Sequence, residues 1–120
     1  MRRAVALVLL LAACRESHER ENREAALRHD LVEMRKAIAD FRANKGRGPH
    51  SLHEVMEAHY LRSIPNDPIT NLADWRVTTE AAVRNDDFAG SAAPAAEPEV
   101  IDVHSRAPGR DSSGKLYSDY

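Results

Sequence analysis

The sequence is poor in several features that define common protein classes. It has one cysteine in 120 residues, so it can form no internal disulfide. Its longest apolar run covers only residues 4–13, whereas a helix that spans a bilayer needs about 20 apolar residues. The formal net charge is −2, which provides no basic excess for binding nucleic acid. These limits leave one small domain that core packing must hold together.

The N-terminal residues have the layout of a secretory signal peptide. Two arginines precede the apolar run, and small residues lead to the single cysteine in the sequence LAAC. This motif resembles the lipobox of bacterial lipoproteins. The resemblance implies a signal peptide over residues 1–13, cleavage between Ala13 and Cys14, and a diacylglyceryl group on the Cys14 thiol. The alternative is an ordinary signal peptide with an incidental cysteine.

Residues 17–44 are predicted to form one long amphipathic helix. One face carries apolar residues at spacings of three and four, namely Leu27, Leu31, Met34, Ile38 and Phe41, with Ala37 beside them. The other faces carry charged residues, including Glu24 and Arg28, which lie one turn apart. Residues 15–22 (RESHEREN) lack the apolar stripe, so they are predicted to be a solvated stalk. Gly46 and Gly48 are expected to end the helix.

The rest of the chain predicts a short helix and a small sheet. Ser51 and Glu54 are typical of a capping box, which begins a helix over residues 52–59. Trp75 is expected to be an aromatic residue of the core. Residues 89–98 are rich in alanine and proline and predict a crossing loop. Three strands are predicted, at residues 75–79, 100–105 and 115–117. This order of elements predicts an α+β fold, with a long N-terminal helix and a short second helix packed on a small antiparallel sheet.

The polar residues do not predict an enzyme. His50, His53 and His59 lie close in sequence, but His53 and His59 are on different sides of a short helix, and zinc needs three or four converging ligands. Asp102 and His104 with a nearby serine are the residue types of a hydrolase triad, yet no nucleophile elbow or oxyanion motif accompanies them. The chain is therefore expected to be non-enzymatic.

Two long stretches resemble a known family. They are EAALRHDLVEMRKAIADFRANKGRGPHSLHEVMEAHYLRSIPNDPITNLADW and IDVHSRAPGRDSSGKLYSDY. Together they are similar to the soluble part of type II secretion pseudopilins, especially the branch of the major pseudopilin, and the similarity covers about residues 21–120. Family members begin with a basic leader ending in glycine, a phenylalanine and a run of about 20 apolar residues, which this sequence lacks.

The resemblance implies a function and a set of candidate ligands. Major pseudopilins bind calcium in the last loop, where this chain offers Asp102, Ser105, Asp111, Ser112 and Asp119 as oxygen donors. The implied function is a membrane-tethered component or accessory protein of a type II secretion or type IV pilus system, with pseudopilins or secretion-platform proteins as partners. The alternative is an envelope lipoprotein that binds another soluble ligand or partner through an inherited pilin-like head.

The combined interpretation divides the chain into three parts. Residues 1–13 are the expected signal peptide, residues 14–23 the lipidated tether, and residues 24–120 the pseudopilin-like domain. The tether would attach the protein to the cell envelope, facing the periplasm. Arg15 stands where many lipoproteins retained at the inner membrane have aspartate, so the outer membrane is the favoured location.

Overall fold

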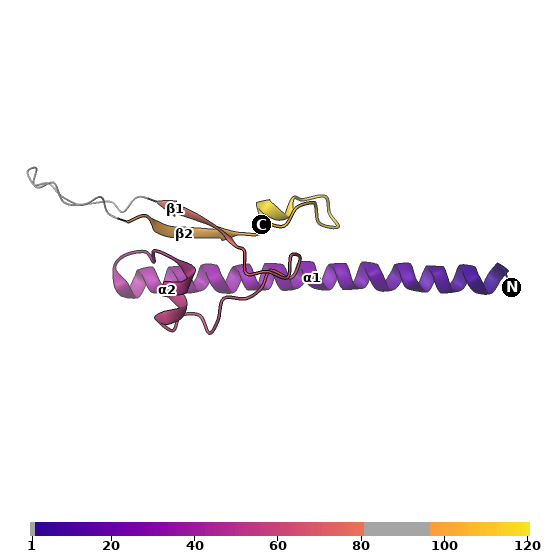
Figure 1. Cartoon of the computed structure of the whole chain (residues 1–120), viewed down its shortest axis with the longest axis horizontal. Coiled ribbons are helices and arrows are strands. Elements are labelled where there is room, and N and C mark those ends of the chain that lie inside the picture. Colours follow the sequence, from indigo (N-terminus) through magenta and orange to yellow (C-terminus); the bar gives the residue numbers. More distant parts are fainter. Residues whose placement is uncertain (1, 81–96) are drawn as a thin grey trace, which may run out of the picture.

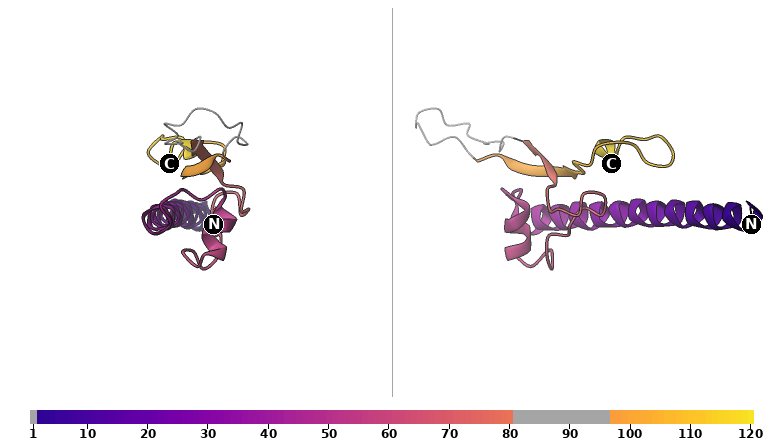
Figure 2. Two further views of the ribbon diagram at one scale, coloured as in Figure 1. Left: turned by 90° about the vertical axis from the view of Figure 1, so that its left-hand side faces the viewer. Right: turned by 45° about the vertical axis from the view of Figure 1, so that its right-hand side comes forward.

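The computed structural model describes residues 2–80 and 97–120, with side chains from residue 5 onward. Its elements are α1 (Arg2–Lys45), α2 (Leu52–Glu57), β1 (Arg76–Glu80), β2 (Glu99–His104) and a 3₁₀ turn, η1 (Tyr117–Asp119). The strands form a two-stranded antiparallel sheet. The predicted α+β fold is confirmed. The sheet and the C-terminal segment lie along one side of α1, and α2 packs beside the C-terminal end of α1 (Figures 1 and 2).

Helix α1 is longer than the sequence pattern predicted. It runs without a break for 44 residues, from Arg2 through the apolar run and the charged stalk. Leucine and alanine dominate the N-terminal run and are strong helix formers, so nothing in it interrupts the helix. The helix ends at Lys45, as the glycines predicted, because Gly46 adopts a left-handed φ of 70° and donates to the Arg42 carbonyl at 3.0 Å.

Helix α2 begins as predicted and ends earlier. The Glu54 amide donates to Ser51 Oγ at 3.1 Å, which confirms the N-cap. The Glu54 carboxylate does not complete the predicted capping box on Ser51, because it accepts from the His50 amide at 2.7 Å instead. The helix ends at Glu57 and not at His59, since His59 takes a positive φ of 66° that a helix cannot continue through.

The sheet contains a bulge that directs it onto α1. Val77 pairs with Val103, and the register shifts between Thr78 and Thr79 so that Thr79 pairs with Val100. The extra residue on β2 brings Val100 and Val103 to the same face although they are three apart. Both are fully buried. The loop after α1 holds β2 as well, because the Val100 amide donates to the Pro49 carbonyl at 2.7 Å.

The third predicted strand is wrong. Residues 115–117 contribute a single bridge, between Arg110 and Leu116, and Tyr117 begins the 3₁₀ turn η1. The cause is Asp111, whose Oδ1 accepts from the Lys115 amide at 2.9 Å and from the Ser113 amide at 2.8 Å. These bonds close a compact turn in place of a ladder. The crossing loop predicted for residues 89–98 falls almost entirely outside the described residues.

The predicted stripe of α1 forms the centre of the core. Its members pack with both buried valines of β2 and with residues of α2 and the C-terminal segment. The core residues are Leu27, Leu31, Met34, Ala37, Ile38, Phe41, Leu52, Val55, Trp75, Val100, Val103, Ala107, Tyr117 and Tyr120. Trp75 is buried as predicted, immediately before β1, and its Nε1 donates to the Pro65 carbonyl at 2.7 Å.

Candidate functional site

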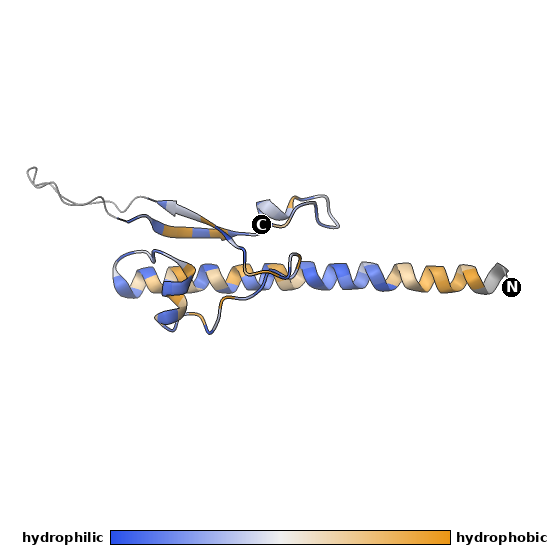
Figure 3. Ribbon diagram, viewed as in Figure 1, coloured by the Kyte–Doolittle hydropathy of each residue, from blue (hydrophilic) through white to orange (hydrophobic). Residues whose placement is uncertain are grey.

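The predicted lipidation residue, Cys14, is an exposed free cysteine on α1. In the sequence it separates the apolar run from the charged residues that follow, a change in hydropathy that Figure 3 shows along α1. One turn later, Ser17 Oγ donates to the Cys14 carbonyl at 2.9 Å, which is a bond within the helix. No described residue from outside α1 bonds to Cys14, so its thiol is open to modification on the side of the helix where it lies.

The part of α1 around Cys14 contributes nothing to the core. Every residue from Val5 to Arg23 is exposed, including large apolar side chains such as Leu9 and Leu10 at 66% and 65%. Glu24 is the first buried residue along the described side chains of the helix. The helix therefore projects from the folded head for about five turns before Arg20 (Figure 1).

None of the helices within the described residues is long and apolar enough to cross a membrane.

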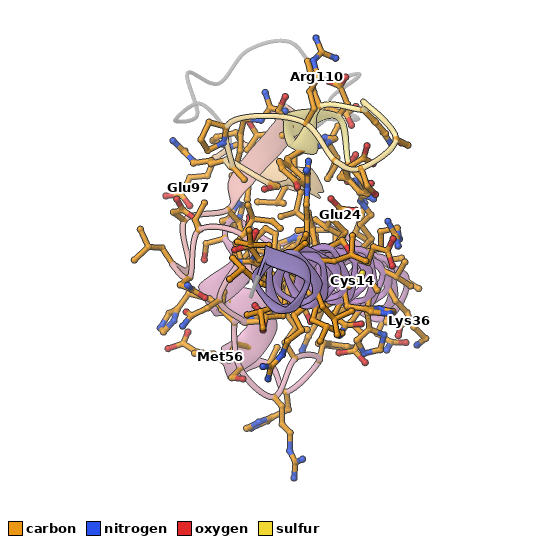
Figure 4. All side chains as sticks on the ribbon, turned by 90° about the vertical axis from the view of Figure 1, so that its right-hand side faces the viewer. Cys14, Glu24, Lys36, Met56, Glu97 and Arg110 are labelled. Carbon is orange, nitrogen blue, oxygen red and sulfur yellow. The ribbon has the colours of Figure 1, made fainter. Side chains whose placement is uncertain are left out.

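A buried carboxylate, Glu24, joins α1 to the C-terminal segment. Its Oε1 accepts from Tyr117 OH at 3.0 Å and from the Ser112 amide at 3.0 Å, and its Oε2 accepts from Ser112 Oγ at 2.7 Å. Arg20, one turn earlier, contacts Oε1 at 3.2 Å and also donates to the Arg110 carbonyl at 2.6 Å. Figure 4 shows Glu24 between α1 and this segment. We call this group, Arg20, Glu24, Ser112 and Tyr117, the C-terminal clasp.

The clasp keeps Glu24 ionised despite its burial. Burial alone would raise the pKa of the Glu24 carboxyl, but the hydrogen bonds from Ser112 and Tyr117, together with the charge of Arg20, lower this pKa below its ordinary value. Beside the clasp, hydrogen bonds from Tyr120 OH and Ser113 lower the pKa of Asp111 strongly. Both carboxylates thus hold the last ten residues in place as anions.

Acid should release the C-terminal segment. Folding lowers the pKa values of Glu24 and Asp111, so their contribution to stability is complete above their unfolded pKa values of about 4. This contribution is lost as the pH falls through the folded pKa values. We expect the Tm to fall steeply below about pH 4. Thermal melts between neutral pH and about pH 2, compared with those of Glu24→Gln, check this, because the variant should show a shallower fall. Parallel profiles would contradict it.

The structure distributes the predicted calcium ligands among protein partners. Asp102 accepts from Arg35 Nε at 2.8 Å, and Ser105 donates to Asp67 at 2.5 Å. Burial would raise the pKa of Asp102, but the bonds from Val103 and Arg35 lower it.

The remaining three predicted ligands are bonded to other residues or exposed. Asp111 binds Tyr120, Ser112 binds Glu24, and Asp119 is exposed. Across residues 2–80 and 97–120, no group of three or more histidine, cysteine or acidic side chains is arranged to hold a metal ion.

Asp102, His104 and the nearby serines do not form a catalytic triad. His104 Nε2 lies 3.2 Å from Asp102 Oδ2, but its Nδ1 lies 2.6 Å from the Tyr120 backbone oxygen. Ser105 bonds to Asp67, and Ser112 bonds to Glu24. Neither serine is paired with the imidazole, so the geometry contains no activated nucleophile at this position.

Sequence reasoning missed two buried acids. Glu24 was assigned to a charged face beside Arg28, but it lies three residues before Leu27 and so continues the apolar stripe by one turn, a spacing that could have revealed its burial. Asp67 forms a turn, in which its carboxylate accepts from the Ile69 amide at 2.8 Å. It is also fully buried and accepts a hydrogen bond from Ser105, which lies 38 residues later in the chain. No local sequence pattern predicts this contact.

The chain matches no protein-family model, no curated protein and no solved structure.

Proposed function

We propose that this chain is a bacterial envelope lipoprotein anchored through Cys14. Its head would act without catalysis, as an accessory or minor component of a type II secretion or type IV pilus system. The LAAC motif and the similarity of the two long stretches to pseudopilins motivate the proposal. The α+β layout, with a long N-terminal helix along a small antiparallel sheet, agrees with it.

One observation carries the anchoring step. Among the side chains that the structure describes, cleavage between Ala13 and Cys14 would remove none that packs in the core, because the first buried one is Glu24. The folded head would be the same before and after processing. A signal peptide must be dispensable to the mature fold, and the exposed side chains of residues 5–13 meet that condition.

Processing would also leave a well-formed helix start. The full-length α1 has no acidic residue in its first turn. A helix that began at Cys14 would place Glu16 in its first turn, where a negative charge interacts favourably with the helix dipole. The charged residues that follow would keep the start of the mature helix in water while two or more acyl chains on Cys14 enter the lipid.

The anchor can be tested by replacing Cys14 with serine. In a Gram-negative host, mass spectrometry of the wild-type chain should show an acylated Cys14 at the mature N-terminus. The Cys14→Ser variant should accumulate as an unprocessed precursor. Ser17→Ala is the matched control, because it removes only the bond to the Cys14 carbonyl and should be acylated normally. An unlipidated mature chain, or one that starts at another residue, would overturn the anchor.

The partner class needs a separate experiment. The anchored protein would be purified from detergent-solubilised envelopes of a host that has the secretion system, with the Cys14→Ser variant as the control. Recovery of pseudopilins or secretion-platform proteins with the wild type alone supports the proposal. Their absence would favour the alternative, an envelope lipoprotein with a different partner.

A further inference from the structure

The two edges of the sheet differ in what covers them. On β2, the Val103 carbonyl accepts from Arg35 Nη2 at 2.8 Å, and the Val100 amide donates to the Pro49 carbonyl at 2.7 Å. Helix α1 and the loop after it therefore cover the outer edge of β2. The sheet has only two strands among the described residues, so none of these residues forms a strand against the outer edge of β1. Every residue of β1 is exposed.

The register identifies the backbone groups that face the open edge. Val103 pairs with Val77, and Val100 pairs with Thr79. The bonded groups of Val100 and Val103 point away from β1, so both pairs occupy non-hydrogen-bonded positions of the ladder. The N–H and C=O groups of Val77 and Thr79 must then point away from β2. Such a row of backbone donors and acceptors is a template for another strand.

The sequence of β1, RVTTE, is complementary to itself in the antiparallel direction. When two copies are paired about Thr78, Val77 of one lies opposite Thr79 of the other at hydrogen-bonded positions. Arg76 then lies opposite Glu80 at both ends, at non-hydrogen-bonded positions where facing side chains come closest. The same register thus pairs the open backbone groups and matches opposite charges twice.

We propose that the outer edge of β1 binds β1 of a second copy of this chain. The product is a four-stranded antiparallel sheet with a twofold axis at Thr78. Val77 pairs with the buried Val103 on the core face, so Arg76, Thr78 and Glu80 share the opposite face. The two charge pairs therefore form on the side of the sheet that faces away from α1.

The dimer has a defined shape and a low intrinsic affinity. Strand β1 runs in the same direction as α1 (Figure 1), so antiparallel pairing of β1 sets the two α1 helices antiparallel on one side of the sheet. Five residues from each copy make a small interface, of the size class that gives weak or transient complexes. The pairing uses only the residues of β1 and does not depend on the lipid anchor.

Disulfide trapping tests the twofold axis directly. A Thr78→Cys substitution is made in the full chain with Cys14→Ser, so that each copy has one thiol, and the protein is oxidised mildly in detergent. Facing Cα atoms at a non-hydrogen-bonded pair lie about 4.5 Å apart, which a disulfide can bridge. The control is Leu72→Cys in the same background, since Leu72 is 60% exposed and lies outside β1. Thr78→Cys should give the covalent dimer and Leu72→Cys should not; equal yields would overturn the proposal.

Charge reversal tests the register. By symmetry, Arg76→Glu or Glu80→Arg alone replaces two attractive pairs with two repulsive ones, and each should reduce trapping through Thr78→Cys roughly tenfold. The double variant restores both pairs and should recover the wild-type yield. Arg76 also donates to the Ser118 carbonyl at 2.8 Å, a contact that the double variant cannot restore. Recovery therefore reports the contact between copies, and a double variant as weak as the singles would contradict the register.

Discussion

Replacing Leu31 with alanine is expected to lower the free energy of unfolding by about 2–5 kcal/mol. Leu31 is 1% exposed and lies in the middle of the α1 stripe, beneath the sheet. Alanine would leave a cavity between α1 and β2 that neither element can close without breaking the bonds that hold β2 to Arg35 and Pro49. A loss of this size would be a large fraction of the stability of so small a domain.

Val32 provides the matched control for this experiment. It is the next residue of α1 and is 62% exposed, so Val32→Ala changes helix propensity but removes no core contact. Its effect should stay within about 0.5 kcal/mol. Chemical denaturation of both variants at neutral pH measures the difference. A Leu31→Ala protein as stable as Val32→Ala would show that the stripe does not pack as described.

Replacing Glu24 with alanine should cost about 2–4 kcal/mol, because it leaves several donors of the C-terminal clasp without their acceptor. Tyr117 OH and the Ser112 amide would lose their bonds at once, and Arg20 would lose its charge partner. The C-terminal segment should then detach while α1 and the sheet remain packed. Limited proteolysis, with mass analysis of the fragments, should show early cleavage after residue 105.

Two further variants distinguish the loss of the hydrogen bonds of the C-terminal clasp from the loss of a negative charge on α1. Glu21→Ala removes an exposed acid from the preceding turn and should leave the protease pattern unchanged. Tyr117→Phe removes one donor but keeps the ring in the core, so it should cost about 1 kcal/mol and give an intermediate pattern. If Glu24→Ala resists proteolysis like the wild type, the last residues do not depend on the clasp.

The parts of the fold that follow local periodicity were predictable from the sequence. The stripe of α1, its end before Gly46, the Ser51 cap and the burial of Trp75 all depend on spacing or on residues near each other in the chain. The two-stranded sheet followed from β-branched residues on both strands. In each case the local preference and the tertiary contacts favour the same structure.

The unpredicted parts depend on contacts between distant residues. Burial of Glu24 depends on hydrogen-bond donors 88 and 93 residues away in the chain. From the sequence alone, a polar residue at the end of an apolar stripe is typical of the solvent-exposed end of that stripe. The missing third strand has a local cause, because the Asp111 carboxylate accepts from backbone amides that a strand ladder would need. The residue pattern around Leu116 is nevertheless equally typical of a strand. Side-chain capture of this kind competes with sheet formation and is weakly encoded by residue type.

Because α1 continues without a break past Cys14, it fixes the rotation of the head about the helix axis relative to Cys14. An α-helix turns about 100° and rises about 1.5 Å with each residue. Adding or removing one residue between Cys14 and Arg20 would leave the head intact but turn it by more than a quarter of a revolution about the axis of α1, relative to the residues at its start. The direction in which the head faces around the axis of α1 is therefore set by the number of residues between Cys14 and the head. The length of the exposed helix thus constrains the orientation of the head as strictly as the identity of any side chain on that helix could.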